Sequence, residues 1–160
     1  MIAFVLAGLV LLMGFSVFFG APYLPTRRRW AKAALDLAKI SKKDLVVDLG
    51  SGDGAILRLV AGCGARSIGY EINPILWLIA KIRLCRDRPK PEVYLANYWL
   101  VDLPAETTIV YAFCVQRDAA KLEKYLSKQK PKKLKVITFG FKLPNRKPVK
   151  HNNGACLYIF

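Results

Sequence analysis

The first twenty residues of the chain form an uninterrupted apolar segment, MIAFVLAGLVLLMGFSVFFG, without a single charged side chain. At a rise of about 1.5 Å per residue, a helix of this length spans roughly 30 Å, the thickness of the hydrocarbon core of a bilayer. A cleaved signal peptide usually carries basic residues before its apolar stretch, and none precede this one. We therefore expect residues 1–20 to form one transmembrane helix.

After this segment, short apolar runs alternate with stretches of helical periodicity. Runs rich in β-branched and aromatic residues predict buried strands, whereas apolar positions three and four residues apart predict amphipathic helices. Strands alternating with helices favour an α/β fold with a parallel sheet of about six strands, in which the last strand forms an edge. Strands are expected at 44–49, 66–71, 92–96, 107–113, 133–141 and 155–160, and helices at 28–40, 53–63, 74–86 and 117–128.

Basic residues dominate the rest of the chain, because the net charge of +15 lies entirely after residue 26. Arg27, Arg28 and Arg29 directly follow the apolar run, so the positive-inside rule places the remaining residues in the cytoplasm or an equivalent compartment. Between residues 121 and 150 the only acidic residue is Glu123. Such a surface suits anionic lipid headgroups or nucleic acid. Next to an anchor, we favour a membrane lipid surface, while nucleic acid stays possible.

The cysteines and the single histidine, His151, indicate no metal site. The cysteines are scattered without CxxC pairing, which is typical of reduced residues in a cytoplasmic domain. One histidine also argues against a Ser-His-Asp or Cys-His mechanism. His151 lies in the polar stretch KHNNG, where we expect a loop. The cysteines are Cys63, Cys85, Cys114 and Cys156.

A glycine-rich turn, VVDLGSGDG at 46–54, ends the strand expected at 44–49 and begins the helix expected at 53–63. Its glycines allow a tight turn and bring bare backbone close to a ligand. The N–H groups at the start of the helix point into the same crevice. In parallel sheets this carboxyl edge is where ligands bind.

Two classes of ligand use such a turn. A dinucleotide needs GxGxxG or GxGxxA, and GSGDGA at 50–55 formally satisfies the second pattern. Asp48 and Asp53, however, would repel a pyrophosphate and attract the cationic methionyl end of S-adenosylmethionine. Glu71, at the end of the next strand, suits ribose hydroxyls in either class. The short chain and the paired aspartates favour a methyltransferase that uses S-adenosylmethionine.

Three segments together narrow this prediction: APYLPT at 21–26, the glycine turn, and GYEINP at 69–74. They resemble the family of membrane-associated lysine N-methyltransferases, whose mitochondrial members modify the adenine nucleotide translocase and the c-subunit of ATP synthase, and which has prokaryotic relatives. The resemblance covers about residues 21–148. It implies a Rossmann-like class I S-adenosylmethionine methyltransferase sheet in a short variant.

The resemblance also implies how the chain is divided. Residues 1–20 would be the anchor, residues 21–43 a membrane-proximal segment and helix that cover the cofactor site, and residues 44–160 the methyltransferase domain. The protein would be a single-pass membrane protein with a cytoplasmic catalytic domain. A prokaryotic cell membrane is favoured, and the mitochondrial inner membrane stays open. The expected substrate is a lysine side chain of a membrane protein.

Carried over residue by residue, the resemblance assigns Glu71 to the ribose hydroxyls and the turn to the methionyl part of the cofactor. The full set of expected cofactor-binding residues is Pro25, Thr26, Asp48, Gly50, Ser51, Gly52, Asp53, Glu71, Asn73, Asn97 and Tyr98.

Candidate catalytic residues are Tyr23, Asn97 and Asp102. A lysine amine must lose a proton before it attacks, and a carboxylate or tyrosine hydroxyl could accept its hydrogen bond. The family usually has Asp at position 97; Asn97 can orient a group but cannot act as a base.

The alternative functions are a lipid or quinone methyltransferase, a nucleic-acid methyltransferase and a non-catalytic module that binds S-adenosylmethionine. The loop after the fourth strand reads AFCV and lacks the Asn/Asp-Pro-Pro-aromatic motif usual in nucleic-acid methyltransferases.

Overall fold

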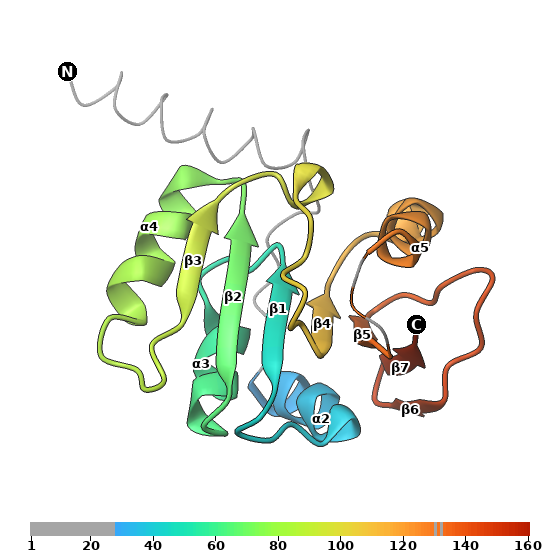
Figure 1. The fold of residues 1–160 in the computed structure, drawn as a ribbon, viewed down its shortest axis with the longest axis horizontal. Coiled ribbons are helices and arrows are strands. Elements are labelled where there is room, and N and C mark those ends of the chain that lie inside the picture. Colours follow the sequence, from blue (N-terminus) through green and yellow to red (C-terminus); the bar gives the residue numbers. More distant parts are fainter. Residues whose placement is uncertain (1–27, 130, 132) are drawn as a thin grey trace.

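The computed structural model describes residues 28–129, 131 and 133–160 (Figure 1). The transmembrane helix expected at 1–20 lies outside these residues, as do Tyr23, Pro25 and Thr26. Among the helices within the described ranges, none is long and apolar enough to cross a bilayer.

Helices and strands alternate along the chain much as the hydrophobic pattern predicts. Two short 3₁₀ turns, η1 and η2, were not expected, and helix α3 begins after the left-handed Gly54 rather than at residue 53. The elements are α2 (Arg28–Ala38), β1 (Leu45–Leu49), α3 (Ala55–Gly62), β2 (Arg66–Glu71), α4 (Pro74–Arg83), β3 (Glu92–Leu95), η1 (Tyr98–Leu100), β4 (Ile109–Ala112), η2 (Gln116–Asp118), α5 (Ala119–Ser127), β5 (Lys135–Phe139), β6 (Lys150–Asn152) and β7 (Ala155–Ile159).

The strands form one seven-stranded sheet in the order β3-β2-β1-β4-β5-β7-β6. The first five strands pair in parallel, whereas β7 runs antiparallel to β5 and β6. In Figure 1 the arrowheads of β1, β2 and β3 therefore point to the same edge of the sheet.

The end of the chain differs from the expectation. The last strand is not an edge, because a seventh strand, β6, pairs with it and takes the edge position. Asn153 and Gly154, with φ of 47° and 82°, join the two strands in a tight hairpin turn. The prediction that His151 lies in a loop is wrong, since it is the middle residue of β6.

Two apolar layers cover the two faces of the sheet. On one face, α2 and α3 pack on alternate residues of β1, β4, β5 and β7, and α4 joins the layer over β3. On the other face, α5 covers the remaining inward residues together with the segments at 98–103 and 141–143. Helices on both faces are thus confirmed, and α5 is the one helix on its side among the described residues.

Gly54 shows how tightly the glycine turn is packed. Its φ is +80°, and a Cβ atom placed on it would lie 2.7 Å from Leu84 Cδ1 and 3.3 Å from Ala80 Cβ in α4. The third glycine of the motif is therefore required by two independent constraints: a left-handed backbone and the close approach of α4.

We predict that Gly54→Ala lowers the free energy of unfolding by about 2 kcal/mol or more, through backbone strain and overpacking. Gly62→Ala is the matched control, because a Cβ atom at the end of α3 meets nothing within 4 Å. Chemical denaturation followed by circular dichroism measures both variants. Equal stability of the two variants would contradict the packing described.

Candidate cofactor and active site

The expected cofactor-binding residues within the described part of the chain come together at one edge of the sheet. Strands β1, β2 and β3 are parallel, so the residues that follow their carboxyl ends lie side by side. The glycine turn follows β1, Glu71 ends β2 with Asn73 just beyond it, and Asn97 and Tyr98 follow β3.

The glycine turn is fastened to β2 by backbone hydrogen bonds. Gly50 and Ser51 donate their N–H groups to the carbonyl oxygen of Tyr70 at 2.9 and 3.0 Å, and Gly54 donates to the carbonyl oxygen of Ser51 at 2.9 Å. Gly50, with φ of +88°, has nothing within 4 Å of a notional Cβ atom. The turn therefore leaves open space beside bare backbone at this point.

Glu71 ties the turn to the start of α4. Its buried carboxylate accepts a hydrogen bond from the N–H of Gly52 at 2.8 Å and another from the N–H of Asn73 at 2.7 Å. Asn73 in turn caps α4, and its Oδ1 accepts from Ile75 N at 2.9 Å. One hydrogen bond to each oxygen of Glu71 fixes the carboxylate and leaves acceptor capacity on both oxygens.

A glycine in β2 makes room for the serine of the turn. A Cβ atom on Gly69 would lie 2.6 Å from Ser51 Oγ and 2.7 Å from Leu57 Cδ1. The hydroxyl of Ser51 is buried and has no hydrogen-bond partner among the described residues. A buried hydroxyl without a partner next to an open glycine turn fits a site that is completed by a polar ligand.

Asp48 is the buried acid of the site. Burial, together with the nearby carboxylates of Glu71 and Asp53, raises its pKa to about 8. A cation placed near these three carboxylates would reverse this effect, because it stabilises the ionised form.

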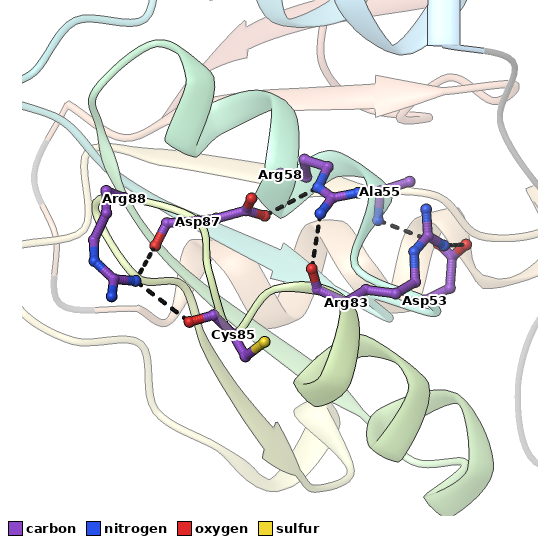
Figure 2. A network of polar contacts seen from close by, with 7 residues as sticks. All are labelled: Asp53, Ala55, Arg58, Arg83, Cys85, Asp87 and Arg88. Carbon is purple, nitrogen blue, oxygen red and sulfur yellow. Dashed lines mark hydrogen bonds and ion pairs between the residues drawn. The ribbon is translucent and has the colours of Figure 1, made fainter.

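Asp53 makes a structural contact in addition to its expected role. Its carboxylate pairs with Arg83 of α4 and accepts a hydrogen bond from Ala55 N at 3.2 Å (Figure 2). Arg58 extends this network, with Nη2 2.8 Å from the carbonyl oxygen of Arg83 and Nε 3.1 Å from Asp87 Oδ2. Asp53 therefore links the turn to α4, and its contact with the cofactor stays a prediction.

The segment after β3 is held by an aromatic cluster. Asn97 caps η1 by accepting from Trp99 N at 3.1 Å, and the ring of Tyr98 packs on those of Trp99 and Tyr125. Burial raises the pKa of the Tyr98 hydroxyl, which therefore stays neutral at ordinary pH. Asp102 is exposed at the end of this segment. The catalytic roles of Asn97 and Asp102 remain predictions.

Two polar contacts that join η2 and α5 to the segment after β5 were not predicted from the sequence. Gln116 binds the backbone of Lys142 twice, by donating to its carbonyl oxygen at 3.0 Å and accepting from its N–H at 3.2 Å. Buried Glu123 accepts from Asn145 N at 3.1 Å and lies 3.7 Å from Arg146. The one acid in the basic stretch 121–150 thus holds the FKLPNRKP segment, and its isolation was a signal that could have indicated this.

Groups of three or more His, Cys, Asp or Glu side chains with the geometry of a metal site do not occur in the described ranges. The groups that the described residues present at this edge are carboxylates, backbone N–H groups, hydroxyls and aromatic rings. These groups suit a ligand that is cationic at one end and carries a ribose.

A comparison of the chain with models of protein families shows the family to which it belongs. The model described as the ANTKMT methyltransferase domain matches residues 48–150, a range that runs from Asp48 to the start of β6. The chain belongs to this family. The match confirms the predicted methyltransferase domain.

Three curated relatives carry names that refer to lysine. A lysine N-methyltransferase of the ATP synthase c-subunit, from Xenopus laevis, is 32% identical over 79% of this chain and 56% of its own length. An adenine nucleotide translocase lysine N-methyltransferase from Mus musculus is 31% identical over 80% of this chain and 56% of its own. A protein-lysine N-methyltransferase from Saccharolobus islandicus is 29% identical over 79% of this chain and 81% of its own. The chain thus spans about half the length of the two animal relatives.

A solved structure is similar over nearly the whole chain. The RNA methyltransferase from Salinibacter ruber, in complex with S-adenosyl-L-homocysteine, is 26% identical, has a TM-score of 0.78, and is matched over 86% of this chain and 92% of its own. The likeness confirms the Rossmann-like class I methyltransferase fold of the family, with seven strands in place of about six.

The raised pKa of Asp48 predicts a pH dependence of cofactor binding. Below about pH 8 the site without cofactor holds a proton on Asp48, and a cationic ligand favours its release. Binding of S-adenosylmethionine should therefore tighten between about pH 6 and 8. Asp48→Asn should bind more weakly and lose this slope. Titration calorimetry in two buffers of different ionisation enthalpy counts the released protons.

The raised pKa of Asp48 also predicts how the stability of the cofactor-free chain depends on pH. Rising pH should tighten cofactor binding but lower the stability of the chain without cofactor. A folded pKa above the unfolded value destabilises the native state progressively as pH rises from about 4 to about 8. Asp48→Asn should therefore melt at a higher temperature than the parent chain, with a gap that widens from pH 5 to pH 8. A constant gap across this range would argue against a buried proton on Asp48.

Proposed function

We propose that the chain is a membrane-anchored protein-lysine N-methyltransferase that modifies a membrane protein. The observation that carries this proposal is the family match, which begins at Asp48 and includes the glycine turn, Glu71 and the FKLPNRKP segment. Relatives named for lysine methylation, in an archaeon and in two vertebrates, each match about four fifths of this chain.

The residues at the edge of the sheet fit the cofactor. Glu71 would accept the ribose hydroxyls with the acceptor capacity that Gly52 and Asn73 leave free. Asp48 and the bare backbone of the turn would face the methionyl end, where the carboxylate compensates positive charge. When bound, the cofactor supplies a methyl group on a sulfonium, which is a strong electrophile.

The chain itself would act mainly by positioning the acceptor and excluding water. A methyl transfer is an in-line displacement, so alignment of the amine supplies much of the rate. An unperturbed lysine has a pKa near 10.4 and is protonated at neutral pH. The half-buried rings of Tyr98, Trp99 and Tyr125 would desolvate the amine and favour its neutral form. Asn97 would orient it, the carboxylate of Asp102 would take the proton, and the hydroxyl of Tyr23 would accept a hydrogen bond from the amine.

Residues 1–20 would hold the enzyme at the membrane, with the domain on the cytoplasmic side. The apolar run is long enough to span a bilayer, and Arg27, Arg28 and Arg29 follow it directly. Residues 21–43 would then connect the bilayer to the domain and bring Pro25 and Thr26 to the cofactor. A prokaryotic cell membrane fits the archaeal relative.

An RNA methyltransferase is the second candidate. Two observations favour it: the similarity to the Salinibacter ruber RNA methyltransferase and the net charge of +15. The loop after β4 argues against it, because AFCV at 112–115 occupies the position where many enzymes acting on base amines carry an Asn/Asp-Pro-Pro-aromatic sequence.

The acceptor can be identified directly. The full chain, incubated with methyl-labelled S-adenosylmethionine and membranes of the source cell, should label a membrane protein, and mass spectrometry should place the label on a lysine. Glu71→Ala should reduce the transfer at least about 100-fold, because it removes the ribose acceptor and frees the turn. Glu106→Ala, at an exposed position in the loop before β4, is the matched control for loss of one acid.

The result also separates the candidates. Label in RNA, abolished by ribonuclease, would replace the lysine proposal with the second candidate. Label in lipid without labelled protein would contradict both. Transfer by Glu71→Ala at the parental rate would show that the cofactor site is elsewhere.

A further inference from the structure

Helix α4 has an apolar face that packs on nothing in the described chain. Ala80 and Leu84 pack inward against Val93 of β3, so this side of the helix is satisfied. The opposite side carries Leu78, exposed to 52%, and Ile82, exposed to 65%. Large apolar side chains this exposed on one helix face mark an interaction surface.

The outward residues form a continuous stripe rather than scattered positions. Ile75, Leu78, Ile79 and Ile82 follow the i, i+3, i+4, i+7 spacing of a single helix face. We call these four residues the α4 stripe.

A basic cleft lies beside the α4 stripe. It has a volume of about 420 Å³ and lies where the end of α4 meets the start of β3. Lys81 and Lys90 line it from two segments, and the one acid in its lining, Glu92, is bonded to the hydroxyl of Tyr94. Neither lysine forms an ion pair with any residue that the structure describes. The remaining lining residues are Leu84, Pro91, Val93 and Tyr94.

Three more basic residues follow Lys81 along the chain before Lys90: Arg83, Arg86 and Arg88. Arg83 pairs with Asp53, and the one acid between residues 81 and 90, Asp87, pairs with Arg58. An apolar helix face bordered by basic side chains is the pattern of helices that lie in the headgroup region of an anionic bilayer. The long lysine side chains can reach phosphates while the apolar residues enter the acyl boundary.

We propose that the α4 stripe rests on an anionic lipid bilayer and that the Lys81–Lys90 cleft binds a lipid phosphate. A second copy of the chain fits this face poorly. From Ile75 to Ile82 the stripe is about 10 Å long and no wider than one helix, roughly 10 Å, so it covers on the order of 100 Å². A stable interface buries roughly 800 Å² on each partner. A two-fold contact would also bring the same basic residues face to face.

The inference rests on the proposed attachment to a membrane. It adds which face of the domain lies against the bilayer. Helix α4 starts at Pro74, three residues after Glu71, so the stripe begins next to the cofactor edge. A helix lying on the bilayer would hold that edge within roughly 10 Å of the headgroups, the diameter of the helix. The acceptor lysine would therefore lie at the membrane surface rather than in a distant domain of the substrate.

Site-specific quenching tests this face separately from the anchor. The full chain, with Cys63→Ser and Cys85→Ser to remove the exposed thiols, carries a polarity-sensitive fluorophore at Ile82→Cys or at Val149→Cys. Val149 is a matched control, because it is an apolar residue exposed to 57% on the segment before β6. The protein is reconstituted into phosphatidylcholine vesicles, with or without phosphatidylglycerol, that contain brominated acyl chains.

We expect the brominated lipid to quench the fluorophore at position 82 at least about twofold in anionic vesicles, and to leave position 149 unchanged. Lys81→Gln with Lys90→Gln should reduce the quenching at position 82 to the level seen without phosphatidylglycerol. Lys42→Gln with Lys43→Gln, which removes two exposed lysines from the loop before β1, should not.

Several outcomes would overturn the inference. Absence of quenching at position 82, or equal quenching at both positions, would show that α4 does not contact the bilayer. A blue-shifted signal independent of brominated lipid would show that another part of the chain covers the stripe. Disulfide-linked dimers of the unlabelled Ile82→Cys variant would show a second copy. Quenching does not depend on methyl transfer, so lysine methylation without quenching would refute this inference alone.

Discussion

The carboxylate of Glu71 accepts hydrogen bonds from two backbone N–H groups, and the geometry of the site depends on them. The bond from Gly52, at 2.8 Å, holds the glycine turn against β2, and the bond from Asn73, at 2.7 Å, fixes the start of α4. Both N–H groups belong to segments without strand or helix partners at that point, so the acid satisfies donors that would otherwise be unpaired. One side chain thereby sets the distance between the turn and α4 and presents its remaining acceptor capacity to a ribose.

The chain as a whole is strongly basic, whereas its cofactor edge is acidic. The chain carries a net charge of +15, yet the cofactor edge gathers Asp48, Asp53 and Glu71. These acids favour a cationic ligand in the crevice, and the basic exterior favours an anionic surface outside it. Arg83 pairs with Asp53 from α4, and Lys81 lies on the same helix beside the proposed lipid cleft. The helix that closes the cofactor turn is thus also the one that would contact the membrane.

Local patterns predicted most of the fold, because buried strands and amphipathic helices leave periodic signals. The hairpin of β6 was missed because its three residues are exposed and polar, although Asn153 and Gly154 carried a turn signal. At the site, the motif indicated the glycines, Asp48 and Glu71. It could not indicate Arg83 as the partner of Asp53, or Glu123 as the partner of Asn145 and Arg146, since these pairs join segments 22 or more residues apart. Long-range polar partners follow from topology, which periodicity does not encode.

We expect Glu71 to organise a site for S-adenosylmethionine at the carboxyl edge of the sheet. The decisive test is a crystal structure of the chain grown with S-adenosyl-L-homocysteine. It should show the ribose hydroxyls on the two oxygens of Glu71, with the bonds from Gly52 and Asn73 preserved and the ligand next to the open face of Gly50. Ligand density away from this edge, or a Glu71 side chain turned away from both N–H groups, would contradict it.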